Sequence, residues 1–472
     1  MLFNSYAFVL GFLPVTLAGF FAACRFGRTV AGCWLVAASL VFYGWWNPTN
    51  LPVLLASVAG NFAVARLIGA TAARPGVQGA VLAGGIAANL AALAYCKYLA
   101  GILGAFGIVF AAPALPLGIS FFTFTQIGYL IDCRQGLARD RSVLDYALFV
   151  TFFPHLIAGP ILHNREVMPQ FAEAATYRFD AHNLAVGITI FLIGLLKKCV
   201  FADQIGAVVA PGFAQAETLA MGGAWLVALS YSLQLYFDFS GYSDMALGMG
   251  KMFGFEFIEN FDFPYISQSI REFWRRWHIS LSTWFRDYLY FPLGGNRVSV
   301  ARNYLNLLLV FFLCGLWHGA NLTFVVWGLY HGLFLILERT RLGANIERLP
   351  RFLRHGYTLL VVMVGWVVFR SDTFASAARY LYAMGGLVCD GEVQPVMRYA
   401  TGPVIWALFA GALASLPLGR WFKARTPKMT TMKPEFLAAG RALEVAWILI
   451  LLFLSIAWQA GETYHPFIYF RF

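Results

Sequence analysis

The sequence predicts an all-α integral membrane protein that crosses the bilayer many times. Hydrophobic residues fill 60% of the 472 positions and charged residues only 12%, whereas an ordinary soluble domain is about one-quarter charged. Apolar stretches of about 17 to 25 residues, long enough to cross the hydrocarbon core, recur along nearly the whole chain. These stretches lack the alternation of barrel strands, so we expect helices that satisfy their own backbone hydrogen bonds.

Each apolar stretch gives one candidate span, and we expect about 10 to 13 transmembrane or re-entrant helices in all. The first stretch has no basic run before it and is followed by Arg25 and Arg28, which favours a retained helix over a cleaved signal peptide. The candidate spans are 2–23, 30–47, 51–69, 79–98, 116–132, 143–161, 183–202, 222–249, 303–317, 322–338, 356–370, 403–418 and 443–460.

The net charge of +11 follows the positive-inside pattern, because the basic residues cluster in short loops between apolar stretches. Arg25 with Arg28 and Arg66 with Arg74 fall on one side of the membrane, which predicts an external N-terminus. This pattern gives no reason to expect nucleic acid as a partner.

The segment Ile266–Val300 differs from the rest because arginines alternate there with aromatic residues. This composition is typical of a helix at the cytoplasmic interface, or of a re-entrant element that faces a water-filled cavity. An interfacial helix without further function explains the composition equally well. His278 lies inside this segment and favours the functional interpretation.

Histidines at glycine-flanked breaks are the best candidates for chemistry. His318 lies in Gly315–Asn321 between two apolar stretches, and His331 follows in Gly328–Gly332. A neutral histidine in a partly dry cavity can accept the proton of a hydroxyl nucleophile. The alternative is a packing histidine that bonds across the bundle. The histidines lack i, i+4 spacing and a nearby carboxylate, so we expect no metal.

Polar residues in apolar stretches, and segments broken by proline and glycine, predict a tunnel or funnel, since broken helices at membrane depth are buried in protein or line a cavity. The broken segments are Leu115–Phe124 and Phe152–Pro160. Asp238 and Asp244 are six positions apart and are expected to be separate hydrogen-bonding anchors. The tunnel-lining candidates are Asp238, Ser240, Tyr242, Asn321, His331 and His155.

Several long motifs resemble the membrane-bound O-acyltransferase (MBOAT) family. The run Glu272–Ser282, of sequence EFWRRWHISLS, is similar to the family signature, as is Leu316–Gly319. Similarity to the alginate O-acetylase branch extends over further segments, so that the resemblance covers most of the chain from about Leu115 onward. These segments start at Leu115 and Phe152 and include Ser240–Met245, Asp287–Gly295 and the terminal Phe467–Phe472.

The resemblance implies a ring of tilted helices around a central tunnel. It implies one membrane-embedded acyltransferase domain over 1–472, with N-terminal helices 1–114, a motif core 115–340 and C-terminal helices 341–472. His318 matches the catalytic histidine of the family, and His278 matches the second histidine of the cytoplasmic funnel. Arginines can attract the phosphates of an acyl donor, and the candidate donor-binding residues are Arg275, Arg276, Trp277 and Arg286.

The activity implied by the resemblance is transfer of an acetyl group from cytoplasmic acetyl-CoA, a substrate and not a permanently bound cofactor. The acceptor would be an exported polysaccharide such as alginate, cellulose or peptidoglycan, reached directly or through an extracytoplasmic partner similar to SGNH hydrolases. The location would be the bacterial inner membrane, in contact with lipid. Two alternatives remain: a transporter of polysaccharide or lipid-linked precursors, and D-alanyl transfer to teichoic acid.

Overall fold

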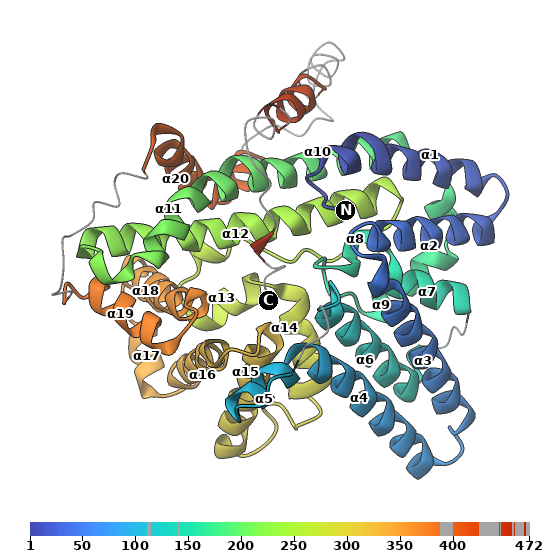
Figure 1. Cartoon of the computed structure of the whole chain (residues 1–472), viewed down its shortest axis with the longest axis horizontal. Helices are drawn as coiled ribbons and strands as arrows, with labels where there is room; N and C mark the ends of the chain where they lie inside the picture. Colours follow the sequence, from blue (N-terminus) through green and yellow to red (C-terminus); the bar gives the residue numbers. More distant parts are fainter. Residues whose placement is uncertain are drawn as a thin grey trace. The chain divides into compact units, whose positions relative to one another are not determined.

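The computed structural model describes residues 1–110, 115–138, 142–387, 400–423, 443, 445–455, 457, 467 and 468. Every regular element among these residues is a helix (Figure 1), and an isolated bridge pairs Phe261 with Trp277. The all-α prediction is therefore confirmed. The end of the last motif, 469–472, lies outside the described residues.

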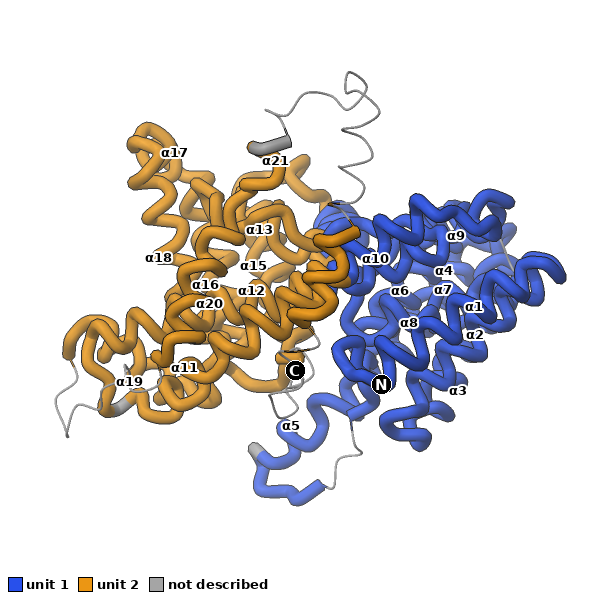
Figure 2. The backbone as a smooth tube through the Cα atoms, turned by 90° about the horizontal axis from the view of Figure 1, so that it is seen from above, with its two compact units in different colours: residues 1–191, 242–259, 283–292 blue, residues 192–241, 260–282, 293–472 orange. Residues whose placement is uncertain are grey.

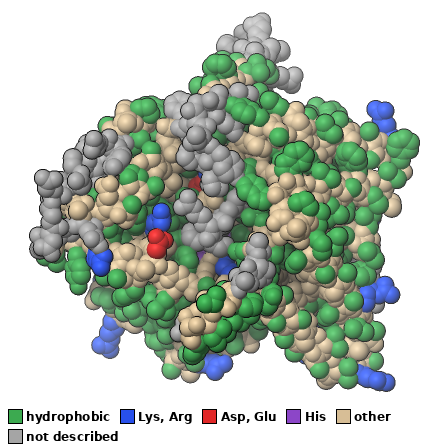
Figure 3. Space-filling model, in the orientation of Figure 1, with side chains coloured by type: hydrophobic (Ala, Val, Ile, Leu, Met, Phe, Trp, Pro, Cys, Tyr) green, Lys and Arg blue, Asp and Glu red, His purple; other side chains and the backbone are tan. Residues whose placement is uncertain are grey.

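Six helices of the described part are long and apolar enough to cross a membrane. A seventh span is possible if the pair Leu322–Leu337 and Arg341–Glu347, bent by 78°, is counted as one. Figure 3 shows hydrophobic side chains over much of one face. The chain is therefore a multi-pass membrane protein, while the ring, the tunnel and the single-domain organisation stay predictions. The six are Ala7–Cys24, Pro48–Ala70, Pro75–Lys97, Ala181–Ala214, Val300–His318 and Arg351–Arg370.

The chain divides into two compact units (Figure 2). Unit 1 comprises Met1–Phe191, Tyr242–Glu259 and Thr283–Pro292. Within it, α3, α4 and α6 pack against one another, and α2 packs against α1 and α7. Its helices are η1 (Ala7–Phe12), α1 (Leu13–Cys24), α2 (Arg28–Gly44), η2 (Pro48–Asn50), α3 (Leu51–Ala70), α4 (Pro75–Lys97), α5 (Leu99–Ala105), α6 (Ile119–Gln135), α7 (Val143–Thr151), α8 (Phe153–Leu156), α9 (Asn164–Ala172), η3 (Ala174–Tyr177) and η7 (Arg286–Tyr290).

Unit 2 comprises Leu192–Gly241, Asn260–Ser282 and Leu293–Phe472. The chain passes between the units within α10 (Ala181–Leu196), α12 (Met221–Met252) and α14 (Ile279–Phe285). The remaining helices are η4 (Lys197–Ala202), α11 (Asp203–Ala214), η5 (Ala216–Thr218), η6 (Pro264–Ile266), α13 (Ile270–Arg276), α15 (Val300–His318), α16 (Leu322–Leu337), α17 (Arg341–Glu347), α18 (Arg351–Arg370), α19 (Phe374–Met384), α20 (Gly402–Ala414) and α21 (Leu418–Lys423).

The predicted span 143–161 is wrong as a continuous helix. Helix α7 starts at the N-cap Ser142 and ends at Phe152, whose ψ of 112° leaves the helical region, and α8 is a single turn with Pro154 near its start. The other broken segment lies against it, because a Cβ added at Gly118 would approach the carbonyl oxygen of Leu156 at 2.9 Å. Both segments of unit 1 are thus packed into protein, as broken helices at membrane depth require.

The segment Ile266–Val300 holds no spanning helix, as the sequence predicted. It forms α13 and α14, of seven residues each, and the five-residue turn η7. Ser269 caps α13 by accepting a hydrogen bond from the amide of Glu272 at 3.0 Å, which is a common helix start. Helix α13 ends where the chain turns into His278.

Helices α15 and α16 form the closest helix pair of unit 2, side by side in Figure 1. A Cβ at Gly315 would lie 2.3 Å from the carbonyl oxygen of Phe324, and one at Gly328 would lie 2.1 Å from that of Phe311. Glycines therefore let the two backbones touch. Small residues next to His318 and His331 could let either a substrate or another helix approach closely. In the structure, a neighbouring helix packs against them.

Candidate active site

His278 occupies a strained turn between α13 and α14. Its φ of 46° lies in the left-handed region, which costs a residue with a β-carbon about 1–2 kcal/mol. Two backbone hydrogen bonds hold the turn: the Asp262 amide donates to the Arg276 carbonyl at 2.9 Å, and the Ile279 amide donates to the Asn260 carbonyl at 3.0 Å. Such strain often marks functional sites.

The His278 side chain is only 1% exposed. Its Nδ1 lies 3.2 Å from Oδ1 of Asn260, and the ring of Phe239 meets the imidazole edge-on at 4.7 Å between centroids. Burial lowers the pKa of His278 to about 3, because an apolar environment disfavours the charged imidazolium. The imidazole is therefore neutral near pH 7.

His318 is the last residue of α15 and is buried. Its imidazole meets Trp327 edge-on at 5.1 Å and Phe369 at 5.2 Å. The indole of Trp317 lies 4.9 Å from the His318 ring and 6.0 Å from the His278 ring. One indole therefore contacts both candidate catalytic histidines within unit 2.

His331 lies on α16 and is fully buried. Its ring contacts Trp274 at 5.2 Å and Trp327 at 5.3 Å. Neither ring nitrogen has a hydrogen-bond partner among the described residues. Trp327 contacts both His318, which is the candidate base, and His331. The aromatic rings packed around His318 therefore also contact this third histidine.

Asp238 belongs to a buried ion cluster. Lys198 Nζ lies 2.8 Å from Asp238 Oδ1 and 2.7 Å from Asp203 Oδ1, and the Lys198 side chain is 1% exposed. The other Asp238 oxygen accepts the amide hydrogen of Ile468 at 2.9 Å. Asp238 is thus a hydrogen-bonding anchor, as the spacing from Asp244 suggested, and its partner Lys198 was not singled out in the sequence.

The other tunnel-lining candidates are spread over both units. Ser240 is fully buried on α12, and Tyr242 stacks on Phe3 at 4.6 Å in unit 1. Asn321 caps α16 by accepting from the Thr323 amide at 3.2 Å. His155 is buried on α8 beside Phe257, at 5.8 Å between ring centroids. Their role in a tunnel stays a prediction.

Of the neighbouring donor-binding candidates Arg275, Arg276 and Trp277, the last two make contacts within the protein. Arg276 pairs with Asp262 at 2.8 Å and with Glu272 at 3.0 Å. Trp277 is buried and packs on Trp366 at 4.8 Å. Arg275, in contrast, is exposed and makes no ion pair with the described residues. Of these three, Arg275 is the side chain most accessible to a soluble anion.

Arg286 borders a pocket of about 330 Å³ in unit 1. Its Nε lies 2.7 Å from Asp287 Oδ1, and Arg165 reaches the other oxygen of that carboxylate at 2.8 Å. Burial raises the pKa of Asp287, but Arg286 and Arg165 outweigh it and hold the pKa below its usual value. The pocket therefore combines the guanidinium groups of Arg286 and Arg165 with the carboxyl groups of Asp287 and Asp132, and His163 and Tyr288 also line it.

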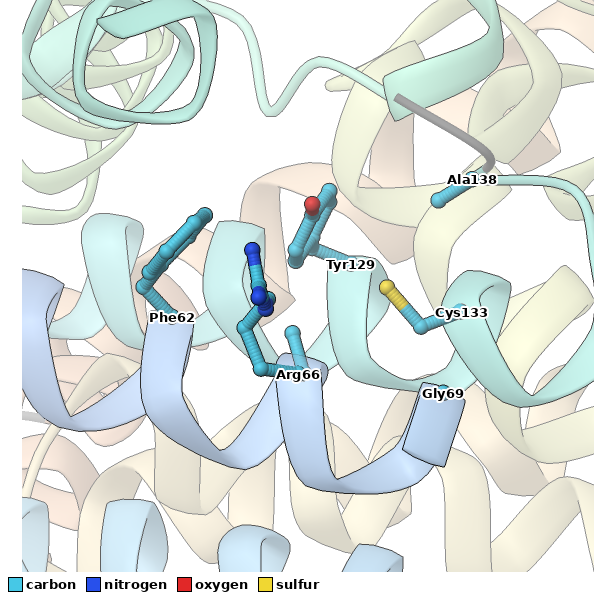
Figure 4. A pocket seen from close by; sticks show the side chains of 7 residues that line it. Phe62, Arg66, Gly69, Tyr129, Cys133 and Ala138 are labelled. Atoms are coloured by element: carbon cyan, nitrogen blue, oxygen red, sulfur yellow. The ribbon is translucent and has the colours of Figure 1, made fainter. Parts of the chain in front are cut away.

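A second pocket of unit 1 is much smaller, about 20 Å³, and lies between α3 and α6 (Figure 4). Phe62 and Arg66 come from α3, and Tyr129 and Cys133 from α6. This volume holds about one water molecule. It is too small for a thioester substrate.

The arrangement of the two buried histidines suits proton transfer. No group of three histidine, cysteine or carboxylate side chains could hold a metal among the residues that the structure describes. Two buried histidines share an indole, and the first of them, His278, is neutral at physiological pH. Sequence reasoning found both histidines, but it missed Asn260, which lies in an irregular loop and belongs to no regular pattern.

Comparison with known proteins adds independent information. Residues 117–365 match the model of MBOAT, the membrane-bound O-acyltransferase family. The chain is 40% identical to the Pseudomonas putida protein named "Probable alginate O-acetylase AlgI", and the match covers 100% of both chains.

Two further relatives carry other names. The peptidoglycan O-acetyltransferase of Helicobacter pylori is 40% identical over 82% of this chain and 80% of its own. The teichoic acid D-alanyltransferase of Bacillus subtilis is 34% identical over 46% of this chain and 58% of its own. Two of the three names describe O-acetyl transfer, and the third describes D-alanyl transfer.

Proposed function

Because this chain belongs to the membrane-bound O-acyltransferase family, we propose that it transfers acetyl groups from cytoplasmic acetyl-CoA to an exported polysaccharide. The observation that carries the proposal is the pair of buried histidines, His278 and His318, that contact the same indole of Trp317. Acyl transfer to an alcohol needs one group to accept the hydroxyl proton. Family membership favours this enzymatic function over that of a transporter.

In the proposed reaction, His318 accepts the hydroxyl proton of the acceptor. The oxygen attacks the thioester carbonyl, a C–O bond forms and the C–S bond breaks. The thiolate of coenzyme A leaves and takes up the proton. His278 lies in the same aromatic shell and, being neutral, can hold a reacting group by accepting a hydrogen bond.

The donor is expected to meet exposed arginines on the cytoplasmic side. Arg275 is exposed, and Arg286 has a side chain 52% exposed beside the 330 Å³ pocket. Guanidinium groups bind phosphate through paired, charge-assisted hydrogen bonds. Coenzyme A carries phosphates, and this supports donor binding by arginine.

Three further parts of the proposal concern the surroundings of the enzyme. A coenzyme A thioester stays in the cytoplasm while the polymer hydroxyls lie outside, so a tunnel in the bacterial inner membrane would join them. In this proposal the acetyl group reaches the acceptor directly or through an extracytoplasmic partner similar to SGNH hydrolases. The relatives acting on alginate and peptidoglycan by name support a cell-surface polysaccharide as the final acceptor.

D-alanyl transfer is the second candidate, because a teichoic acid D-alanyltransferase is among the relatives. That match covers 46% of this chain, whereas the match to the alginate O-acetylase covers 100%. The longer match favours acetyl. Membrane vesicles supplied with acetyl-CoA or with a D-alanyl carrier protein will distinguish the two donors.

The proposed function is tested by the acetate that mild alkali releases from extracytoplasmic polymer. We expect acetate from cells that express the wild-type chain and none above background from His318→Ala cells with matched membrane levels. The matched control is His182→Ala, because His182 is an exposed histidine of α10, and it should match wild type. Acetate from a well-expressed His318→Ala chain would exclude His318 as the base.

A further inference from the structure

Three polar atoms lie within hydrogen-bonding distance of the side-chain oxygen of Asn260 at the turn that carries His278. The Ser280 amide donates to Oδ1 at 3.1 Å, and the Ser280 hydroxyl donates at 2.8 Å. Nδ1 of His278 lies 3.2 Å from the same atom. Asn260 is 2% exposed, so this cluster is closed to bulk water.

These contacts fix the orientation of the amide. A backbone N–H can only donate, so the atom that it meets must be the amide oxygen and not the amide nitrogen. An amide oxygen can only accept. Nδ1 of His278 must therefore carry the hydrogen, and Nε2 is the nitrogen that carries the lone pair.

We propose that Asn260 is a positioning residue that selects the Nδ1–H tautomer of His278 and so makes Nε2 the acceptor nitrogen in acyl transfer. The proposal rests on the proposed function, because it assigns His278 a part in that reaction. It adds a residue outside every motif on which the sequence analysis relied.

The backbone of the same loop holds the histidine in place. The carbonyl of Asn260 accepts the Ile279 amide, and Phe261 pairs with Trp277 in the isolated bridge. Residues on both sides of His278 are thus tied to residues 260–262. Asn260 therefore supports the turn both through its backbone carbonyl and through its side-chain oxygen.

Carboxylates of the segments next to His278 are paired with basic side chains. Asp262 of the preceding loop and Glu272 of α13 bind Arg276. On α12, Asp238 next to Phe239 binds Lys198. On α15, the titratable neighbour of Trp317 is His318. Burial alone lowers the pKa of His278 to about 3, so no nearby carboxylate stabilises its charged form.

The decisive variant is Asn260→Asp, which keeps an acceptor oxygen but adds a negative charge beside Nδ1. An adjacent carboxylate favours imidazolium and raises a histidine pKa by about 1 to 3 units. Acyl transfer needs neutral His278, so activity in the variant should fall as the pH drops through this raised pKa. We expect the acid limb of the pH–rate profile to move upward by about 1 to 3 pH units, with activity kept at pH 8.

The assay measures radiolabelled acetate moved from acetyl-CoA to polymer in membrane vesicles with the full-length chain, from about pH 3, the pKa of His278, to a pH of about 8.5, so that the acid limbs of wild type and variant both fall inside the range. The matched control is Asn306→Asp, because Asn306 is equally buried and donates to the Leu293 carbonyl at 3.1 Å. It also gains a buried carboxylate, but it lies outside the cluster, and its acid limb should match wild type. An Asn260→Asp chain that is inserted and has the wild-type profile, or is inactive at every pH, overturns the proposal.

The outcomes separate this inference from the proposed function. If the wild-type vesicles move no acetate, the proposed function fails. If wild type is active, the Asn260→Asp profile shifts as predicted and the Asn306→Asp profile matches wild type, the proposed function and this inference both stand. A second measurement needs no variant of Asn260: the nitrogen spectrum of ¹⁵N-histidine-labelled protein, with His278 assigned by its loss in His278→Gln. A protonated Nδ1 and an unprotonated Nε2 support the proposal, and the opposite tautomer overturns it.

Discussion

Arg275 and Arg276 are neighbours in the chain, but their side chains have different surroundings. Arg275 is exposed, whereas Arg276 binds two carboxylates. Arg275→Ala should raise the KM for acetyl-CoA with kcat unchanged, as loss of uniform binding does. Loss of one charge-assisted contact worth about 1 kcal/mol corresponds to about a fivefold change.

Arg276→Ala should mainly lower stability, by about 1 to 2 kcal/mol, because Asp262 and Glu272 lose a shared partner. Both predictions are checked on the two purified variants, by thermal unfolding and by initial rates at varied acetyl-CoA concentration. Equal effects of the two substitutions on KM would contradict this division of roles.

At the scale of residues, the sequence singles out the histidines but not their support. His278 was found because it lies in the basic, aromatic segment that carries the long motif Glu272–Ser282, and His318 because it lies at a glycine-flanked break between two apolar stretches. Asn260 and Lys198 were missed because their roles depend on contacts with residues 18 and 40 positions away. No local pattern encodes such contacts, and only the folded chain shows them.

The contact of α15 and α16 depends on glycine. Gly328→Ala would place a methyl group 2.1 Å from the Phe311 carbonyl oxygen, so the helices must separate. We expect a loss of about 1 to 3 kcal/mol and reduced transfer, because α15 carries His318. The detergent-solubilised protein can be followed by thermal unfolding.

The control for this substitution is Gly84→Ala. Gly84 lies in α4 and nothing lies within 4 Å of an added Cβ, so alanine should be neutral or stabilise by about 0.5–1 kcal/mol. If both variants unfold at the same temperature, close packing at Gly328 is not what holds the helix pair.

Helix existence was more predictable than helix continuity. The apolar stretches 51–69 and 79–98 appear as α3 and α4 with ends shifted by a few residues. The stretch 143–161 fails as one helix because Phe152 leaves the helical region and Pro154 follows. Pro154 predicts a helix break in this stretch, whereas hydropathy alone joins the two parts into one span.

The buried ion cluster connects parts of the chain that are far apart in sequence. Lys198 reaches Asp203 and Asp238, and Asp238 accepts a hydrogen bond from Ile468. Lys198→Met would leave two carboxylates buried without a cation, which costs about 3 to 5 kcal/mol. We therefore expect a large fall in the thermal unfolding midpoint.

Two variants make this test specific. Lys251→Met removes a lysine whose partner, Glu256, is 74% exposed at the side chain, and it should cost less than about 1 kcal/mol. The triple variant Lys198→Met, Asp203→Asn, Asp238→Asn removes all the charges together and should recover part of the loss. A Lys198→Met protein as stable as wild type would show that the cluster contributes nothing.

For the molecule as a whole, composition was sufficient for the fold class, because lipid requires apolar helices wherever the chain crosses. Family membership follows from long motifs and is shown by the match over residues 117–365. Hydropathy could not predict the division into two units, because α10, α12 and α14 each begin in one unit and end in the other.

The left-handed backbone at His278 has a consequence for attempts to make this enzyme more robust. Glycine adopts that conformation without the cost that histidine bears, which is about 1–2 kcal/mol. Glycine would also leave a cavity in place of a buried imidazole and remove its contact with Asn260, and such large-to-small core substitutions cost about 2–5 kcal/mol. Relief of backbone strain at position 278 would therefore not raise heat resistance, and stabilising substitutions should be sought outside this turn.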